Sequence, residues 1–551
     1  MKQPGISLFQ VGIPEKGLDL LGAPQESRDM YFLAVGVGGW RAIASLVFFG
    51  YAMSDLIFKT IQAEARKLVA RHQQYAFGLH EETRRLQERS GLVWTKEVLT
   101  PEYWGCNDGF NPYHVRKHAK SIAYAVEKSL KTKLYRPRPA IRYSVPKDDG
   151  SPRNVSVFQV ADQAIARLVF KRLLEKNKGR FSSKSFAYRS DLTVHDAVLH
   201  LSSSFAGRKR IFMAEYDFRK YFDSISHDHI ERVLNDKRFY ITDEERKIIQ
   251  GFLRSSIYSI ADYQLGHTQK RNKGIPQGVS TSLFLANIAA YPLDRRLEQL
   301  RVDFARYADD TLVWSDDYGE LCHAVEVLAA TADEMGVEFN LKKSPGVRML
   351  VEEGAGAELA KTTYVEFVGY KVNAHTIGIR DSTAERIKSH IARLIYANLL
   401  EQPLAGRCIP GRVSGPRDAD YTVMISQIRR YLYGELTEEK LAKYLSGDTP
   451  EMRYRGLMSF YPIVDDDTQL KQLDGWLLHT IYTSLLRRAE LFQQAGLQVT
   501  ARPHGFPKEE LTSPNLGFYR IPSFRRIAKM LNKAARKYGP SSVAHPVGPS
   551  S

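Results

Sequence analysis

Two adjacent aspartates, Asp309 and Asp310, interrupt a strand-like run that extends from Phe304 to Val313. β-Strands disfavour Asp, and two like charges side by side repel each other. The pair therefore fits few places in a fold. One is a solvated hairpin turn, and another is a metal site at the tip of a hairpin. Other acidic pairs occur in this chain, so the dipeptide alone does not decide between the two.

A third carboxylate, Asp217, ends the apolar run 210–218. If the two strands are neighbours in one sheet, Asp217 converges with Asp309 and Asp310. Mg²⁺ takes oxygen ligands and is commonly held by one or two carboxylates together with substrate phosphates. Two such ions about 4 Å apart can activate a 3′-hydroxyl and stabilise a leaving pyrophosphate. Cations would also offset the repulsion between the acids.

The charge balance favours a polyanionic partner. The chain has 551 residues, with 79 Lys and Arg against 62 Asp and Glu, which gives a formal charge of +17. Nucleic acid is the simplest partner, because its phosphates release counterions when basic side chains bind them. The alternative is a generally basic surface without a ligand.

The cysteines and the N-terminal region indicate a reducing, cytoplasmic setting. Cys106, Cys322 and Cys408 are too scattered for a zinc ribbon or a disulfide framework. The chain start lacks the layout of a secretory signal. Residues 31–53 approach the length of a membrane span, but the central Arg41 and several glycines favour a buried helical hairpin. No membrane is therefore expected as a partner.

Alternating patterns predict an α+β fold. Turn residues at 147–150 lie between β-rich flanks, which indicates a hairpin. Beyond about residue 380 the apolar spacing becomes helical, and Ser382–Glu385 has the pattern of a capping box. Further strands are expected at 210–218, 337–344 and 364–372, and helices at 161–176, 227–234 and 318–336.

Seven segments resemble the successive motifs of reverse transcriptases, especially the bacterial group that includes group II intron, retron and phage-defence enzymes. In the order of the chain they read IRYSVPKDDGSPRNVSV, SFAYRSDLTVHDAV, YDFRKYFDSISHDHI, GIPQGVSTSLFLANIAAYPLD, RYADDTLVW, VEFNLKKS and FVGY. The resemblance covers residues 110–375 and continues more weakly beyond them.

The resemblance implies a right-hand polymerase fold. Its parts would be an N-terminal, mainly helical extension at 1–110, fingers at 111–200, a palm with an antiparallel sheet at 201–375 that carries a fingers insertion around 235–273, a helical thumb and C-terminal region at 376–538, and a disordered tail at 539–551.

The resemblance also implies roles for individual residues. Asp217, Asp309 and Asp310 would be catalytic and, with the backbone carbonyl of Phe218, would hold two Mg²⁺ ions, for which Mn²⁺ can substitute. Phe222 would clash with a ribose 2′-hydroxyl and so favour deoxynucleotides; the alternative is a core residue. The remaining nucleotide-binding residues would be Lys147, Arg153, Arg189, Gln277, Gly278 and Lys343, and the template and primer would contact Gly274, Pro276, Gly369 and Tyr370.

The spacing of basic residues near the C-terminus predicts a basic helix face. Arg525, Lys529 and Lys533 recur at helical intervals, with Lys537 one turn further. We expect this face to bind template phosphates, and a solvated basic face is the alternative.

Two departures from the family matter: the first bears on how the loop handles the template, and the second argues against a complete mobile-intron protein with its own nuclease. Ser282-Leu283 stands where relatives usually carry Ser-Pro, and the C-terminal part lacks the paired Cys and His residues of a fused nuclease. The segments at 429–436 (RRYLYGEL) and 456–467 (GLMSFYPIVDDD) resemble thumb segments of phage-defence reverse transcriptases.

We therefore expect an RNA-directed DNA polymerase that makes cDNA from a dedicated, structured non-coding RNA, with dNTPs as substrates, in antiviral defence. The alternatives are a maturase-like RNA-binding scaffold and a template-independent or RNA-synthesising polymerase. Phe222 and the sequence YADD argue against RNA synthesis. The sequence leaves the template, the primer and the oligomeric state open, a homo-oligomer included.

Overall fold

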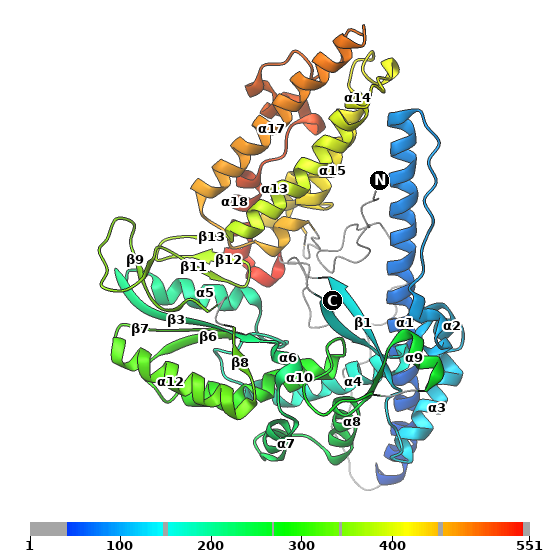
Figure 1. Ribbon diagram of the computed structural model, residues 1–551, viewed down its shortest axis with the longest axis vertical. Coiled ribbons are helices and arrows are strands. Elements are labelled where there is room, and N and C mark those ends of the chain that lie inside the picture. Colours follow the sequence, from blue (N-terminus) through cyan, green and yellow to red (C-terminus); the bar gives the residue numbers. More distant parts are fainter. Residues whose placement is uncertain (1–40, 147–151, 267–268, 341–343, 450–455, 544–551) are drawn as a thin grey trace.

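The chain folds into a lower part that contains the β-sheets and an upper part of packed helices (Figure 1). In this computed structural model, the described residues are 41–146, 152–266, 269–340, 344–449 and 456–543. A long helix, α1 (Arg41–Ser90), runs along one edge from the lower part up to the helical part. The mixture of helical layers and antiparallel sheet confirms the expected α+β class.

Helix α1 packs through a single stripe. Its buried residues Ile57, Ile61, Ala65 and Val69 repeat every four positions, so they lie on one face of the helix. This face contacts three helices of the lower part, α2 (Pro112–Lys117), α3 (Ala119–Lys131) and α4 (Val160–Asn177).

The prediction of a helical hairpin at residues 31–53 is wrong for residues 41–53. Residues 41–53 continue without a break into α1, and residues 31–40 lie outside the described part of the chain. Gly50 does not interrupt the helix, because a single glycine costs only about 1 kcal/mol there. Within the described residues, no helix combines the length and apolarity needed to cross a membrane.

A small sheet beside α1 has the strand order β2-β1-β4-β5. The expected hairpin forms from β1 (Ala140–Pro146) and β2 (Pro152–Val157), which pair antiparallel. β4 (Ser256–Tyr258) pairs with β1 in parallel, and β5 (Gln269–Lys270) covers the edge of β4. The chain between 235 and 273 thus returns to the sheet of the first hairpin.

The central sheet has the order β10-β9-β3-β7-β6, and its middle strand is β3 (Arg210–Arg219). β3 pairs antiparallel with β7 (Asp310–Ser315) and β9 (Gly346–Val351). α12 (Tyr318–Met335) covers one face, and α5 (Val194–Phe205) lies on the other (Figure 1). The other elements here are β6 (Asp303–Tyr307), β8 (Glu338–Phe339), β10 (Lys361–Thr362), α6 (Tyr221–Ser224), α7 (His227–Asn235), α8 (Asp243–Leu253), α9 (Ile260–Leu265), α10 (Ser280–Ala289) and α11 (Tyr291–Leu297).

A three-stranded sheet, β11 (Val365–Phe367), β12 (Tyr370–Val372) and β13 (Ile377–Ile379), leads into the upper helices. The predicted capping box at Ser382–Glu385 is wrong, because α13 (Asp381–Ile395) already begins after Arg380. The Arg380 amide donates to the Gly369 carbonyl (3.1 Å), which ties the helix start to the strand turn. The upper helices are completed by a π turn (Tyr396–Leu400), α14 (Glu401–Leu404), α15 (Ala419–Tyr433), α16 (Glu438–Ser446), α17 (Asp467–Gln494) and α18 (Phe524–Tyr538).

Candidate active site

The pairing of β3 with β7 puts Asp217 opposite Asp310. Residues directly opposite in an antiparallel pair have Cβ atoms about 4.5–5.5 Å apart. Because Tyr307 pairs with Asp310, the turn between β6 and β7 contains only Ala308 and Asp309. The structure therefore brings the three carboxylates predicted from the sequence to one end of the central sheet.

The turn that carries Asp309 is strained. Ala308 has φ +59°, in the left-handed region, where a residue with a Cβ is disfavoured by about 1–3 kcal/mol. The guanidinium of Arg306, which is fully buried, donates to the Ala308 carbonyl (3.2 Å). Asp294 on α11 accepts two hydrogen bonds from Arg306, both 2.6 Å. The hairpin tip is thus held from below by an ion pair.

Two further groups complete what we call the Arg306 cluster (Arg306, Asp294, Asn287 and Ser185). Arg306 also donates to Asn287 Oδ1 (3.0 Å) on α10 and to Ser185 Oγ (2.7 Å). Burial raises the pKa of Asp294, and Arg306 opposes that rise. The two short hydrogen bonds from Arg306 to Asp294 favour the charged pair. Sequence reasoning missed this cluster, whose only visible signal is an arginine inside an apolar strand.

Asp217 is fixed by a segment that follows α12. The Asn340 side chain donates to Asp217 Oδ2 (2.9 Å), and the Asn340 amide donates to the Asp217 carbonyl (2.8 Å). The Asp217 amide in turn donates to Ser344 Oγ (3.0 Å). Within the described residues Asp217 Oδ1 accepts no hydrogen bond, so it remains open for a ligand. Asn340 and Ser344 lie over 120 residues away in the chain, and no local pattern linked them to Asp217.

The carboxylates repel one another. The pKa of Asp310 is raised to about 7, first because surrounding protein atoms remove water and then because Asp309, Asp217 and Glu215 add negative charge. Because the Asp310 side chain reaches solvent, repulsion by the neighbouring carboxylates is the stronger physical cause of its raised pKa. The donor set suits Mg²⁺ or Mn²⁺ chemically. In the described part of the chain, however, no three His, Cys, Asp or Glu side chains are gathered closely enough to form a metal site.

Phe218, next to Asp217, has a buried ring that stacks on Tyr221 and Phe339. This packing anchors the end of β3. The proposed role of its backbone carbonyl as a metal ligand stays a prediction.

Phe222 lies in α6, which begins shortly after Asp217 at the end of β3. Its ring is half-buried and meets Tyr188 edge-on, with centroids 6.4 Å apart. Tyr188 has φ +58°, and after burial the charge of Asp309 contributes to raising its pKa. Tyr188 is therefore a neighbour of the site that sequence reasoning missed, although it stands next to Arg189 in the motif AYR. The ring packing is compatible with both interpretations of Phe222.

The loop 274–278 is tied to the protein's own backbone. The Ile275 amide donates to the Phe222 carbonyl (2.5 Å), and the Gln277 carbonyl accepts from the Ser156 amide (2.7 Å). A Cβ on Gly274 would lie 2.6 Å from the Asp223 carbonyl oxygen. A Cβ on Gly278 would lie 2.8 Å from the Ser156 carbonyl oxygen. The missing side chains thus allow contact with α6 and β2, and Pro276 is buried.

The basic residues expected at a triphosphate differ in their placement. Arg153 is exposed on β2, whereas Lys147 and Lys343 lie outside the described residues. Arg189 is buried, and it donates to Asp191 and to the carbonyls of Ser182, Ser185 and Lys178. With its guanidinium used internally, Arg189 stabilises the fold, and this placement does not support the expected phosphate contact.

The residues expected at the primer and template are also partly internal. Gly369 has φ +88° in the turn between β11 and β12, which ends at Tyr370. Tyr370 is buried, and its hydroxyl donates to the Phe460 carbonyl (2.6 Å). Tyr370 therefore links this turn to the helical part, and a direct contact with a primer would have to come from the turn.

On α18 the expected basic face is half neutralised. Arg525 and Lys529 both pair with Asp467 (Arg525 at 2.5 Å, Lys529 at 3.2 Å). Lys533 is exposed and makes no ion pair within the described residues.

Comparison with known proteins agrees with this geometry. Residues 145–372 match a family described as "Reverse transcriptase (RNA-dependent DNA polymerase)". The chain contains a reverse transcriptase domain. This domain includes both paired strands and all three carboxylates.

The relatives of the reverse transcriptase domain are distant. The chain is 26% identical over 221 residues to the group II intron-encoded protein LtrA of Lactococcus lactis subsp. cremoris. The aligned region covers 40% of this chain and 34% of LtrA. The chain is 25% identical over 223 residues to the retron Ec73 reverse transcriptase of Escherichia coli, covering 38% of this chain and 64% of that protein. The chain thus spans about a third of LtrA and less than two thirds of the retron enzyme.

Solved structures resemble the chain only loosely. Apo telomerase from Candida tropicalis aligns with a TM-score of 0.37 and 12% identity, covering 76% of this chain and 68% of that one.

Proposed function

We propose that the chain is an RNA-directed DNA polymerase that copies a structured non-coding RNA into DNA from dNTPs. The observation that carries the proposal is the register of β3 with β7 inside the reverse transcriptase domain, which places Asp217 opposite Asp310 and next to Asp309. The composition supports a nucleic-acid partner through its formal charge of +17.

Each part of the site has a task in this proposal. Asp217, Asp309 and Asp310 hold the divalent cations, which, when bound, activate a 3′-hydroxyl and neutralise charge on the leaving pyrophosphate. Asn340 orients Asp217, and the Arg306 cluster keeps the strained turn in place. Phe222 would exclude a 2′-hydroxyl, and Arg153, which is exposed on β2, would supply a guanidinium for phosphate.

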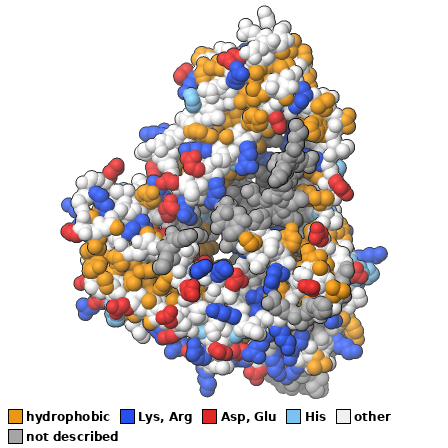
Figure 2. Space-filling view, viewed as in Figure 1, with side chains coloured by type: hydrophobic (Ala, Val, Ile, Leu, Met, Phe, Trp, Pro, Cys, Tyr) orange, Lys and Arg blue, Asp and Glu red, His pale blue; other side chains and the backbone are white. Residues whose placement is uncertain are grey.

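The predicted domains are retained in this proposal, with fingers at 111–200, a palm at 201–375 and a thumb from 376. The visible face in Figure 2 carries Lys and Arg side chains interspersed with acids, not one continuous basic patch. On this face, individual basic residues would therefore guide the template.

Antiviral defence is the proposed biological setting. The two segments that resemble phage-defence thumbs, 429–436 and 456–467, pack directly on each other. A Cβ on Gly456 would overlap the backbone of Tyr433 and Gly434. This close packing supports a common structural role for the two segments.

The test is primer extension by the purified full-length protein with Mg²⁺, an RNA template, a DNA primer and either dNTPs or NTPs. The proposal expects extension with dNTPs only, lost in Asp217→Asn and Asp309→Asn. Asp316→Asn is the matched control, because Asp316 is an exposed carboxylate just beyond β7. A second measurement compares the protection of the host against phage. If Asp217→Asn and Asp309→Asn both protected the host as the parent protein does, a maturase-like scaffold would replace the polymerase proposal.

A further inference from the structure

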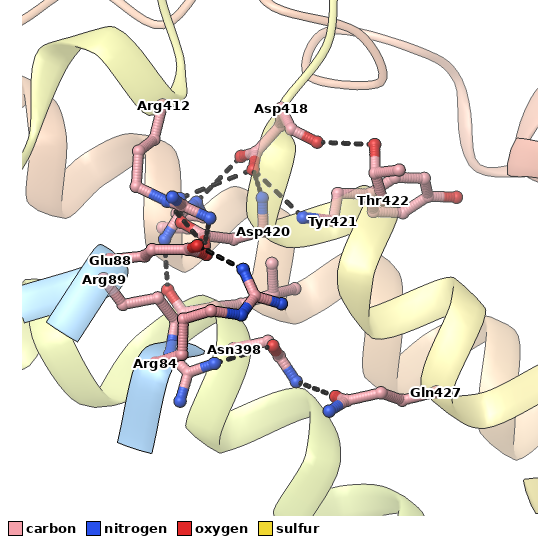
Figure 3. A network of polar contacts seen from close by, with 12 residues as sticks. Arg84, Glu88, Arg89, Asn398, Arg412, Asp418, Asp420, Tyr421, Thr422 and Gln427 are labelled. Atoms are coloured by element: carbon pink, nitrogen blue, oxygen red, sulfur yellow. Dashed lines mark hydrogen bonds and ion pairs between the residues drawn. The ribbon is translucent and has the colours of Figure 1, made fainter. Parts of the chain in front are cut away.

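A small polar pocket lies where the end of α1 meets the upper helices, far along the chain from the acids. Arg89 on α1 donates to Asn398 Oδ1 in the π turn (3.2 Å), a contact between residues 309 positions apart. Figure 3 shows Arg89 beside Asn398, with Arg412 and Asp420 above them. The pocket has room for about one water-sized group. Its lining comprises Arg89, Asn398, Gln402, Pro403, Arg407, Ile409, Arg412, Asp420, Arg488 and Phe492.

The carboxylates at this junction are already paired. Asp420 accepts hydrogen bonds from Arg412 (2.8 Å) and Arg488 (2.6 Å). Asp418, which is fully buried, accepts from Arg488 (2.9 Å) and is hydrogen-bonded to His504 (2.8 Å). Neither acid is hydrogen-bonded to the two remaining arginines of the pocket, Arg89 and Arg407.

Arg89 and Arg407 have donors to spare. Arg89 is 9% exposed, and among the described residues it bonds only to the neutral amide of Asn398 and its buried Nε has no partner. Arg407 bonds to the neutral amide of Gln402 (2.7 Å). A buried polar group without a partner is unfavourable, and a buried charge is more so. Burial lowers the pKa of Arg89; the charges of Asp420 and Glu401 oppose this lowering, and those of Arg412 and Arg85 add to it.

We propose that this pocket binds a phosphate group, with Arg89 and Arg407 as its ligands and Arg412 alongside. Guanidinium groups match the tetrahedral oxygens of phosphate through paired hydrogen bonds. Because the enclosed part of the pocket admits about one water-sized group, one phosphate oxygen enters it, and the rest of the phosphate and any nucleoside stay outside, on the side of the half-exposed Arg407. The phosphate can be inorganic, the 5′-terminal phosphate of a strand, or a diester within it.

The pocket is shared by α1, the π turn, α14, α15 and α17, so an occupied pocket would clamp α1 to the upper helices. A ligand that binds only the folded, closed arrangement stabilises it by mass action. The proposal does not depend on polymerase activity, because none of these residues lies near the acids of β3 and β7.

The test is calorimetric titration of the full-length protein with three probes at constant ionic strength. The probes are inorganic phosphate, a single-stranded tetranucleotide with a 5′-phosphate, and the same tetranucleotide with a 5′-hydroxyl. Hydrogen exchange of peptides covering residues 86–92 and 405–413 reports whether the bound probe protects this junction.

We expect at least one probe to bind saturably and to protect both peptides, and Arg407→Gln to weaken that binding about tenfold or more. Arg407 is the residue of choice because it is half-exposed, so its loss leaves the fold intact. Arg487→Gln, one residue before Arg488 on an exposed face, is the control and should bind within about twofold of the parent protein.

The pattern among probes identifies the source. Binding of inorganic phosphate indicates a free anion, a requirement for the 5′-phosphate indicates a strand end, and equal binding of both tetranucleotides without inorganic phosphate indicates a backbone diester. The proposal is overturned if no probe protects either peptide, or if Arg407→Gln binds as tightly as the parent protein.

Discussion

Replacing Asp294 by Asn tests how the hairpin of Asp309 is held. Asp294 and Arg306 are both fully buried and share two hydrogen bonds of 2.6 Å. Breaking a buried ion pair by removing one partner costs about 3–5 kcal/mol, since the other charge is left uncompensated. This is a large part of the roughly 5–15 kcal/mol that typically stabilises a domain. We therefore expect Asp294→Asn to unfold at much lower urea concentration.

A double variant separates the charge effect from simple loss of contacts. Arg306→Met/Asp294→Asn removes both charges and leaves Ser185 Oγ and the Ala308 carbonyl without the Arg306 donor, at about 1 kcal/mol each, whereas Asn287 Oδ1 still accepts from Ser185 Oγ. The double variant should thus lose less stability than the two single variants, Asp294→Asn and Arg306→Met, added together.

The assay is urea unfolding followed by circular dichroism, with hydrogen exchange of residues 303–315 as the local measurement. Arg296→Met is the control, because Arg296 is a partly exposed arginine on the same helix and should lose under about 1 kcal/mol. A loss below about 1 kcal/mol in Asp294→Asn, or strict additivity in the double variant, would refute the reasoning.

Three further outcomes are expected. Phe222→Val should raise incorporation of NTPs relative to dNTPs at least about tenfold in primer extension, whereas unchanged selectivity would assign Phe222 to the core. Burial raises the pKa of Asp162 to about 6, so the folded state holds this proton more tightly than the unfolded chain and stability falls as pH rises from about 4 to about 6. Asp162→Asn should flatten this part of the urea-stability profile, by about 3 kcal/mol in total, and an unchanged slope would contradict the assignment. Lys533→Gln should reduce the slope of log affinity against log salt by about 1 in RNA filter binding. Lys529→Gln should reduce this slope less, because Lys529 is already paired with Asp467. Equal effects of the two substitutions would show that the ion pair does not matter.

The acids could be predicted because each ends or interrupts an apolar strand and because family motifs surround them. Their supports could not. Asn340 and Ser344 reach Asp217 across 123 and 127 positions, and Arg306 reaches Ser185 across 121, distances at which sequence spacing carries no information. The family motif predicted Arg189 as a phosphate ligand. It could not show that the Arg189 guanidinium is hydrogen-bonded to Asp191, two residues further along the chain.

Helix ends were predicted less well than helices. The pattern at Ser382 is a valid capping signal, but the tie between Arg380 and Gly369 starts the helix earlier. Similarly, Arg41 and the glycines within residues 31–53 favoured a helical hairpin, and tertiary packing of the stripe from Ile57 to Val69 favours one long helix from Arg41 instead. In both cases a contact outside the local window decided the outcome.

The position of β3 at the centre of the main sheet has a consequence for biosynthesis. Its partners β7 and β9 end at Ser315 and Val351. The end of β9 thus lies well over a hundred residues after the end of β3 at Arg219. At about 5–20 residues per second, the ribosome would need on the order of ten seconds to deliver both after β3 has emerged. During that time β3 has two unpaired edges, which are prone to pairing with other nascent chains. Chaperone demand during expression should therefore be concentrated in the interval between the synthesis of Arg219 and that of Val351.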